Sequence, residues 1–533
     1  MNRVTPNRTA RAASVVLTLI GVLCVASAFA LSNSTGPNGC NAQAVHALGY
    51  TGQGVKIGLV TAQHALVTHE AFFDKDENGY PVGNSCVSCI DTTSENIYSP
   101  LDHDTNMAGI IASRGGQLYP NDKGAAPSCS IINAKISAGQ SVSLSWVQAA
   151  LDQFRTQGCR VIATGVAFSS GDITPDGQNQ WSSLYDYYAY QYGLIFANAA
   201  GNESNTIAVF GDAYNGITTG GLIYDDPDVY RKIGAVSGSG LTVDGRRKPE
   251  AAAPAYNQRV PTTGGDTVWT ITYGQTEGYT SWAVPHTAGV AAVLLSYADT
   301  TTEPDDGKSE VIKAVIVNST FPNILAKNGS WTDPANTTWH PERGYGRLDT
   351  LRAYQTLAAG KVVPGSLTQQ KGWAYRSFKE KNAFTEQYAI SGSKNQRLIT
   401  TLTWHRKVSQ SLIPESNSLN ISLTIYDPQG QQVISLTGGK DNLRKADILL
   451  QQDGIYEVRI SKSSILWGQA TTRYYALAFE LLDPLEGDWN TDYKVDLGDL
   501  TLLWDCWLEG CALDAFELLS AHWLAIDARY AAP

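Results

Sequence analysis

The sequence predicts an α/β unit with a parallel sheet, followed by an antiparallel β-sandwich. Two observations lead to this prediction. Between residues 42 and 360, short apolar runs that read as buried strands alternate with longer helical segments. This alternation is typical of a parallel sheet with helices on both faces. Between residues 366 and 483 the helical periodicity gives way to alternation of period two, with turn residues between the runs, which is typical of a sandwich.

The first thirty residues read as a secretory signal peptide. Arg3, Arg8 and Arg11 precede an apolar run over 14–26, and the segment Ala28-Phe-Ala30 has the small-x-small pattern of a cleavage site. An uncleaved membrane anchor is the alternative, but the run is short, and no further apolar stretch of about 20 residues follows. We therefore expect cleavage after Ala30.

Charge and composition narrow the classes of function. The formal net charge is −11, and loss of the signal removes three arginines and no acid, which makes it −14. Such a charge argues against a nucleic-acid partner or an anionic membrane surface. Apolar residues make up 43% of the chain and charged residues 17%, which is ordinary for a globular protein. We expect a secreted or cell-surface protein without a transmembrane segment after signal cleavage.

Individual runs carry the two fold predictions. In the first unit the strand-like runs are apolar throughout, and active sites of such sheets lie at the carboxyl ends of the strands. In the second unit the runs alternate, and Asp427-Pro-Gln-Gly430 supplies a turn. The runs are Val55–Val60, Val161–Ala163 and Leu194–Ala197 in the first unit, and Leu423–Ile425, Tyr456–Ile460 and Tyr475–Phe479 in the second.

Three polar residues stand where catalytic chemistry could occur. Ser281 opens an apolar helix, so that it could serve as a nucleophile with the helix N-terminus favouring negative charge, although serine there is often only a cap. His103 begins another small-residue helix and could act as a general base. Asn202 follows a strand and could donate to an oxyanion, although Gly-Asn is also a common turn.

Together these segments resemble the subtilase family of serine peptidases. The resemblance implies a subtilisin-like fold in 42–360, peptide-bond hydrolysis, Ser281 as nucleophile, His103 as base and Asn202 as oxyanion donor. Five segments carry it in the family's order: His103–Ile111 (HGTHVAGI in the family), Gly124–Pro127 (GVAP), Ala199–Asn202 (AAGN), Lys248–Pro254 (KPDVVAP) and Tyr279–His286 (GTSMAAPH).

The acidic member of the family's triad is missing. Thr61 stands where the family's first strand ends in Asp, and a threonine can accept a hydrogen bond from the imidazole but supplies no charge. Neutralising that acid costs about 10⁴ in turnover in a trypsin-like enzyme. Asp102 and Asp104 flank His103, but neighbours one apart on a helix are not expected to face each other. No replacement acid is identified, and Asn106 also replaces the second histidine of the motif.

Three functions remain open. A secreted serine endopeptidase with an altered triad would retain Ser281, His103 and Asn202 for chemistry. A catalytically inactive relative would use the cleft to bind proteins or peptides, which the loss of the acid favours. The family strand VINMSLG reads Val161-Ile-Ala-Thr-Gly-Val-Ala167 here, so that the family's specificity does not transfer. A purely structural surface protein is the third possibility. Separately, the β-sandwich over 366–483 could bind substrate or serve only as a structural spacer.

The segment 484–528 resembles a dockerin-type repeat. Its acidic loop places side-chain oxygens at positions 1, 3, 5, 9 and 12 and a main-chain carbonyl at position 7, which suits Ca²⁺. The implied partner is a cohesin-like or other surface protein. The loop lacks a second copy, since the second of two similar helical stretches has none, and an acidic turn is the alternative. The expected ligands are Asp488, Asn490, Asp492, Lys494, Asp496 and Asp499.

Two weaker patterns were also weighed. Seven cysteines remain after signal cleavage, and Cys86-Val-Ser-Cys89 is expected to form a local disulfide rather than a zinc or redox site, because no second ligand pair accompanies it. Cys506 and Cys511 are a second candidate pair. Asp74–Gly79 begins like a calcium loop, but Ser85 at position 12 makes a surface turn the better interpretation.

Overall fold

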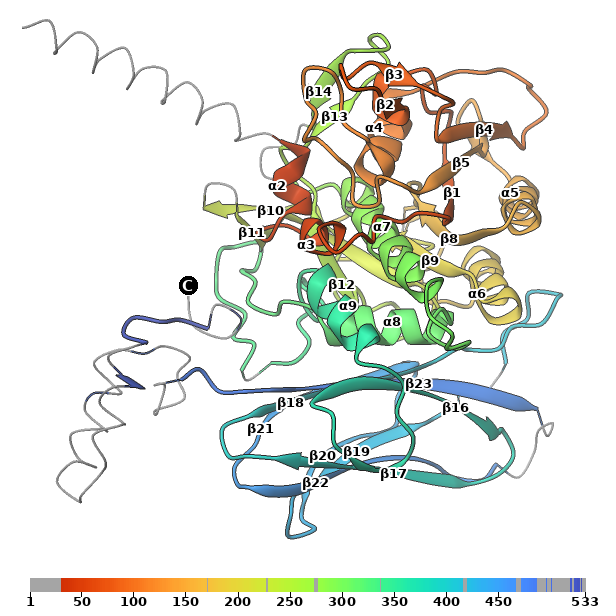
Figure 1. The fold of residues 1–533 in the computed structure, drawn as a ribbon. Helices are drawn as coiled ribbons and strands as arrows, with labels where there is room; N and C mark the ends of the chain where they lie inside the picture. Colours follow the sequence, from red (N-terminus) through yellow and green to blue (C-terminus); the bar gives the residue numbers. More distant parts are fainter. Residues whose placement is uncertain are drawn as a thin grey trace, which may run out of the picture.

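The chain forms an α/β unit that rests on two mainly antiparallel sheets, and both appear in the computed structural model (Figure 1). The fold class expected from the sequence is thereby confirmed for these two parts. The small C-terminal calcium-loop module and the signal segment fall outside the described residues. The structure describes residues 30–486 except 170, 227–228, 273–276, 336, 416–418 and 466–470, and beyond them residues 495, 500, 518–519, 522–527 and 529.

A mainly parallel sheet of eight strands forms the centre of the first unit, in the order β11-β10-β9-β8-β1-β5-β4, with β12 beside β10. Only the β10–β11 pair is antiparallel. β1 lies between β5 and β8 and is buried on both faces after its first residue, which explains its continuous apolar run. The strands are β1 Lys56–Thr61, β4 Val87–Asp91, β5 Ser130–Lys135, β8 Cys159–Thr164, β9 Ile195–Ala199, β10 Ile217–Asp226, β11 Val229–Ile233 and β12 Ala251–Pro254.

Helices cover the sheet, and small residues let two of them approach closely. A Cβ on Gly289 would lie 2.5 Å from the Ala125 Cβ, and one on Gly109 would lie 2.2 Å from the Pro261 ring. These glycines therefore allow α7 and α4 to pack tightly beside the strand ends. The helices are α2 Leu31–Thr35, α3 Ala42–His46, α4 Asp102–Ala112, α5 Leu144–Thr156, α6 Gln180–Tyr192, α7 Thr280–Ala298, α8 Ser309–Asn318, α9 Thr350–Ala358 and the 3₁₀ turn Glu70–Phe72.

Three short hairpins decorate the α/β unit. They pair β2 with β3, β6 with β7 and β13 with β14. The β13–β14 hairpin matters for the site, because β13 ends at Pro261, against α4. Their strands are β2 Asp74–Lys75, β3 Pro81–Val82, β6 Ser137–Ala138, β7 Ser141–Val142, β13 Arg259–Pro261 and β14 Trp269–Ile271.

The second unit consists of a five-stranded sheet, β15-β17-β22-β19-β20, and a four-stranded sheet, β16-β23-β18-β21. In β22 the buried side chains alternate, as the sequence predicts, whereas β18 is buried along its whole length. The strands are β15 Gly365–Leu367, β16 Lys371–Lys379, β17 Phe384–Gly392, β18 Arg397–Trp404, β19 Ser422–Tyr426, β20 Gln432–Leu436, β21 Leu443–Leu449, β22 Gly454–Lys462 and β23 Thr472–Leu482.

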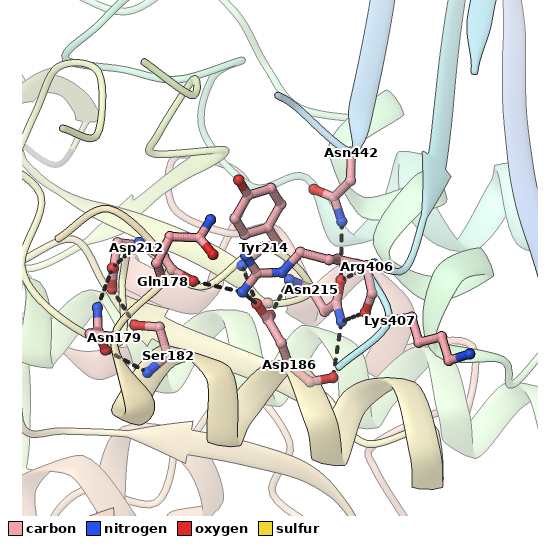
Figure 2. A network of polar contacts seen from close by, with 12 residues as sticks. Gln178, Asn179, Ser182, Asp186, Asp212, Tyr214, Asn215, Arg406, Lys407 and Asn442 are labelled. Atoms are coloured by element: carbon pink, nitrogen blue, oxygen red, sulfur yellow. Dashed lines mark hydrogen bonds and ion pairs between the residues drawn. The ribbon is translucent and has the colours of Figure 1, made fainter. Parts of the chain in front are cut away.

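A buried ion pair joins the two units (Figure 2). The Arg406 Nη2 atom, just after β18, donates to the Asp186 Oδ2 atom on α6 at 2.6 Å. The Arg406 and Arg246 guanidinium carbons lie 3.7 and 3.6 Å from the centre of the Tyr214 ring, which places the two guanidinium groups on opposite faces of that ring. The sheets are thus fastened to the α/β unit by charge and stacking as well as by apolar contact.

Candidate active site

Ser281 lies in the first turn of α7, at the opening of a cavity. Its residue is 8% exposed. The first N–H groups of a helix have no acceptor within the helix, so that they and the helix dipole favour negative charge beside this hydroxyl. The helix begins at Thr280, and Pro285 lies inside it. Because proline has no N–H, the Ser281 carbonyl loses its usual helical partner.

His103 is the second residue of α4, and its side chain is 34% exposed. It lines a cavity of about 270 Å³ together with Ser281 and Asn202. The structure thus brings together the three residues for which the sequence predicts chemistry. Among the described residues no direct hydrogen bond joins the Ser281 hydroxyl to the His103 ring, as is common in serine enzymes without substrate.

Asn202 follows β9, and hydrogen bonds to its side-chain oxygen hold the amide in place. Its Oδ1 atom accepts hydrogen bonds from the Thr280 N–H at 2.9 Å and the Thr280 hydroxyl at 3.1 Å. These two donors assign the amide orientation, which leaves the Nδ2 group as the donor available to the cavity. Thr280, which sequence reasoning missed, thereby prepares Asn202 for an anion beside Ser281.

His103 has an acidic partner, and the sequence reasoning did not find it. The Asp104 Oδ1 atom lies 2.9 Å from the His103 Nδ1 atom, and the Asp104 side chain is fully buried. The expectation that these neighbours do not face each other is therefore wrong. Consecutive helical residues are about 100° apart around the axis, and in the first turn a short carboxylate can bridge to the ring nitrogen nearest the neighbour's backbone. A signal was present, since Asp104 occupies the glycine position of the HGTH motif.

Thr61 makes no contact with the imidazole. Its hydroxyl donates to the Gln63 carbonyl at 3.0 Å and accepts from the Asn133 Nδ2 atom at 2.6 Å. The hydroxyl proton and one of its two acceptor lone pairs are therefore used within the sheet and the loop that follows it. The expectation that Thr61 accepts from the His103 ring is corrected by this geometry, and Asn133, on β5, is the residue that draws the hydroxyl away.

Asp102 turns away from His103. Its Oδ1 atom accepts hydrogen bonds from the Thr262 hydroxyl and from the Thr263 N–H and hydroxyl. Burial alone would raise the pKa of Asp102, but these hydrogen bonds outweigh it and hold the pKa below its usual value. Asp102 therefore fastens the start of α4 to the loop after β13, and it is not the acid for the imidazole.

A second histidine, His286 on α7, is excluded as a base by its surroundings. His286 is fully buried, and its ring nitrogens contact Gln258 Nε2 at 3.0 Å and Cys40 Sγ at 3.6 Å. Burial lowers the pKa of His286 to about 3, so that it is neutral at all ordinary pH values. His286 therefore serves the core, and His103 is the histidine that reaches the cavity.

One side of the cavity wall comes from the segment that replaces the family strand. Gly165, Ala167 and Phe168 follow β8 and line the cavity. A Cβ on Gly165 would lie 2.2 Å from the Met107 sulfur, so that any other residue here would require the Met107 side chain to move. The Phe168 ring packs against Trp181, with 4.5 Å between the ring centres, which fixes one side of the opening.

Other residues that the sequence singled out take no part in this site. Cys86 and Cys89 are free thiols at the start of β4, where an extended backbone separates residues three apart, so that the expected local disulfide is wrong. Cys40, Cys129 and Cys159 are free as well. The Asp76 carboxylate accepts from the Asn78 and Tyr80 N–H groups, which makes this acidic segment a turn.

The described residues contain neither a metal-binding cluster nor a membrane-spanning helix. Within the described part of the chain, no group of three or more His, Cys, Asp or Glu side chains could hold a metal ion. The six expected calcium ligands of the C-terminal loop lie outside that part, as do Cys506 and Cys511. Of the helices that the structure describes, none is both long and apolar enough to cross a membrane.

The first unit of the chain matches a known protein family. The model of the subtilase family, peptidase S8, matches residues 29–346. Pyrolysin of Pyrococcus furiosus is 24% identical over 364 residues, which cover 58% of this chain and 24% of pyrolysin. Subtilisin E of Bacillus subtilis is 26% identical over 281 residues, which cover 51% of this chain and 63% of subtilisin E.

Among solved structures, the prenylagaramide maturation protease PagA aligns with a TM-score of 0.44 and 18% identity, over 59% of this chain and 98% of that one. The chain spans less than two thirds of the length of either pyrolysin or subtilisin E. The family model, in contrast, covers more than half of the chain, including all the residues that line the cavity. This protein therefore belongs to the subtilase family of serine peptidases.

Proposed function

We propose that the protein is a secreted serine endopeptidase that hydrolyses peptide bonds in proteins or peptides. The observation that carries the proposal is the meeting of Ser281, His103 and Asn202 around one cavity, from three separate elements. A nucleophile, a base and an anion donor at one opening are the groups that acyl transfer requires. Secretion is supported by the signal-like first thirty residues.

The first step transfers the acyl group to the enzyme. The Ser281 oxygen attacks the carbonyl carbon of the scissile bond while His103 Nε2 takes the hydroxyl proton, and a tetrahedral oxyanion forms. The imidazolium then gives that proton to the amine as the carbon–nitrogen bond breaks. In the second step, water attacks the ester with its proton passing to His103, and the proton returns to Ser281 as the acid leaves.

The oxyanion is stabilised by groups already in place. Asn202 Nδ2 is the side-chain donor, because its oxygen is occupied by Thr280. The N–H groups of the first α7 turn lie beside the Ser281 hydroxyl as a second source. Loss of one such donor in a serine enzyme costs about 10²–10³ in turnover.

A fluorophosphonate probe tests this proposal directly. The oxygen of a serine that a base activates attacks the phosphorus of the probe and displaces fluoride, so that mature protein should be labelled at Ser281 and the Ser281→Ala variant should not. His103→Ala is the matched control, because it retains the hydroxyl but removes the base. Labelling of Ser281→Ala would place the reactive serine elsewhere, and an unlabelled wild-type protein would contradict the proposal.

One observation favours a second function, namely binding of a peptide without hydrolysis. Thr61 supplies no charge to the imidazole, and its hydroxyl is committed to Gln63 and Asn133. In this case wild-type protein would resist labelling while a fluorescent peptide library would still yield ligands that compete for the cavity. The two functions are therefore separated by the same labelling experiment.

The C-terminal segment is proposed to bind Ca²⁺ and to attach the protein to a cohesin-like or other surface partner. Its support is the spacing of Asp488, Asn490, Asp492, Asp496 and Asp499 in the sequence, with the Lys494 carbonyl. Titration calorimetry of the full chain with Ca²⁺ should show one site, which Asp488→Ala together with Asp492→Ala should remove. Asp74→Ala is the control, since its segment forms an ordinary turn.

A further inference from the structure

We propose that Asp104 is the positioning acid of the active site, in place of the carboxylate that the subtilase family carries where this chain has Thr61. The acid has in effect moved from the end of β1 to the first turn of α4. This inference rests on the proposed peptidase function, and it adds the residue that holds His103 in its working state. The comparisons with other proteins assign no residue to this role.

The contact is made at the ring nitrogen that such an acid must reach. Asp104 Oδ1 lies 2.9 Å from His103 Nδ1. A carboxylate only accepts, so that Nδ1 carries the proton and Nε2 keeps its lone pair. Nε2 is then free to take the Ser281 proton, and the carboxylate stabilises the imidazolium that forms without taking a proton itself.

Asp104 is also held firmly enough to position a ring. Its side chain is fully buried, whereas that of His103 is 34% exposed. Its second oxygen, Oδ2, accepts the Gln63 N–H at 2.7 Å. With one oxygen on the imidazole and the other on the main chain after β1, the carboxylate cannot rotate without losing a hydrogen bond in a buried place.

The loss of the acid at Thr61 and the gain of an acid at Asp104 then have one explanation, a change in the position of the acid. The sheet position that usually carries the acid is Thr61, which bonds to Gln63 and Asn133 instead of the ring. The helix position that usually carries glycine is Asp104. Both side chains contact Gln63, so that a carboxylate at each position would place two like charges close to each other. Thr61→Asp alone is therefore not expected to improve the enzyme.

A purely structural role for Asp104 is the competing explanation, because its bond to the Gln63 N–H also fastens the loop after β1. Asp104→Asn separates the two roles. The asparagine oxygen can still accept the Gln63 N–H, while its NH₂ group faces His103 Nδ1 and donates to it. The imidazole then takes the Nε2-protonated form, which cannot accept a proton from serine.

The tautomer of His103 is the first measurement, since it needs no activity. Full-length protein with ¹⁵N-histidine, assigned through His103→Gln, should show Nδ1 protonated and Nε2 unprotonated in the neutral ring. In Asp104→Asn these assignments should exchange, while the melting temperature stays close to that of wild type. The inference is overturned if wild type carries its proton on Nε2, or if Asp104→Asn leaves the tautomer unchanged.

Kinetics and rescue are the second measurement. Asp104→Asn should lower the rate of fluorophosphonate labelling and kcat on a peptide substrate by about 10³–10⁴, with KM within about threefold. Asp104→Gly should be similarly slow, and the double variant Thr61→Asp/Asp104→Gly should recover at least about 100-fold of that loss. A labelling rate for Asp104→Asn within threefold of wild type overturns the inference, as does a folded double variant no faster than Asp104→Gly.

The two measurements also separate this inference from the proposed function. If the tautomer exchanges in Asp104→Asn as expected but wild-type Ser281 is never labelled, Asp104 positions the ring and the peptidase function fails. If Ser281 is labelled and neither the tautomer nor the rate responds to Asp104→Asn, the peptidase function stands and the role of Asp104 is structural.

Discussion

Two pairs of a basic and an acidic side chain have similar nitrogen–oxygen distances but differ in how far they are exposed to solvent. His103 and Asp104 lie 2.9 Å apart in the cleft, and the histidine side chain is 34% exposed. Arg406 and Asp186 lie 2.6 Å apart between the two units, and their side chains are 2% and 0% exposed. In the cleft, His103 keeps its Nε2 atom free for Ser281. Between the units both partners are enclosed.

The two pairs differ in whether an atom left without a partner can reach a substrate. The Asp186 carboxylate accepts from Arg406 and also from the Tyr214 and Asn215 N–H groups, at 3.2 and 2.7 Å. Arg406 Nη2 also donates to the Gly177 carbonyl, and the guanidinium face stacks on Tyr214 (Figure 2). The Arg406 Nε and Nη1 atoms have no hydrogen-bond partner, but they are buried where no substrate can reach them, so that this pair can only hold structure. The pair in the cleft leaves His103 Nε2 open, and an open nitrogen beside a serine is what chemistry needs.

Removing one charge of the enclosed pair should have the largest effect on stability. Asp186→Asn leaves the Arg406 guanidinium buried without its counter-charge, and it turns an NH₂ group toward the main-chain donors that the carboxylate accepts. Breaking such a buried pair costs about 3–5 kcal/mol. We expect this loss in the free energy of unfolding, measured by urea denaturation, whereas the labelling rate of the remaining folded protein should be unchanged.

An exposed pair provides the matched control. Arg160 and Asp299 lie 2.7 Å apart with side chains 37% and 43% exposed, so that Asp299→Asn should cost less than about 1 kcal/mol. Equal losses for the two variants would show that burial does not distinguish these pairs. A large fall in the labelling rate of folded Asp186→Asn would show that the units are coupled through the cleft.

A second fastening between the units should make stability depend on pH. Lys445, on β21, donates to the Val317 and Asn318 carbonyls at the end of α8, at 2.8 and 3.2 Å, and burial lowers the pKa of Lys445 to about 7. Between pH 7 and about 10.4 the unfolded chain then binds more protons than the folded one, so that stability rises with pH. The slope is at most about 1.4 kcal/mol per pH unit.

Lys445→Met isolates this dependence, because methionine has no proton to lose. The difference in unfolding free energy between wild type and the variant should change between pH 7 and 10 in favour of wild type, and it should be constant below pH 6, where lysine is protonated in both states. A difference that does not change with pH would mean that Lys445 keeps its charge in the folded protein.

Sequence patterns were sufficient where a strand shows an unbroken apolar run or a regular alternation. The apolar run before Thr61 predicted β1, which is buried on both faces, and the alternation in Tyr456–Ile460 predicted β22, which is buried on one. They were insufficient for the burial of β18, whose sequence mixes threonines with apolar residues. The four-stranded sheet packs against α8, and for that reason Arg397–Trp404 is buried on both faces and shows no alternation of burial.

Local sequence patterns identified the site residues that stand in motifs and missed the one whose role depends on a tertiary contact. Ser281, His103 and Asn202 stand in motifs whose order along the chain indicates their roles. Asp104 does not, because its role depends on a side-chain direction in the first turn of a helix, which spacing does not determine. The Arg406–Asp186 pair joins residues 220 apart in the sequence, and no local pattern reports such a contact.

The smallest expected effect comes from the acid on the other side of His103. Asp102→Asn removes a charge as close in sequence as Asp104, but the Asp102 carboxylate accepts from Thr262 and Thr263 and does not touch the ring. The asparagine oxygen can replace one acceptor, so we expect a labelling rate within about threefold of wild type and an unchanged His103 tautomer. If Asp102→Asn instead slows labelling as much as Asp104→Asn, the site depends on negative charge around His103 in general. A small effect beside a large one shows that the bond from Asp104 to Nδ1 is what matters, since charge and sequence distance are matched between the two variants.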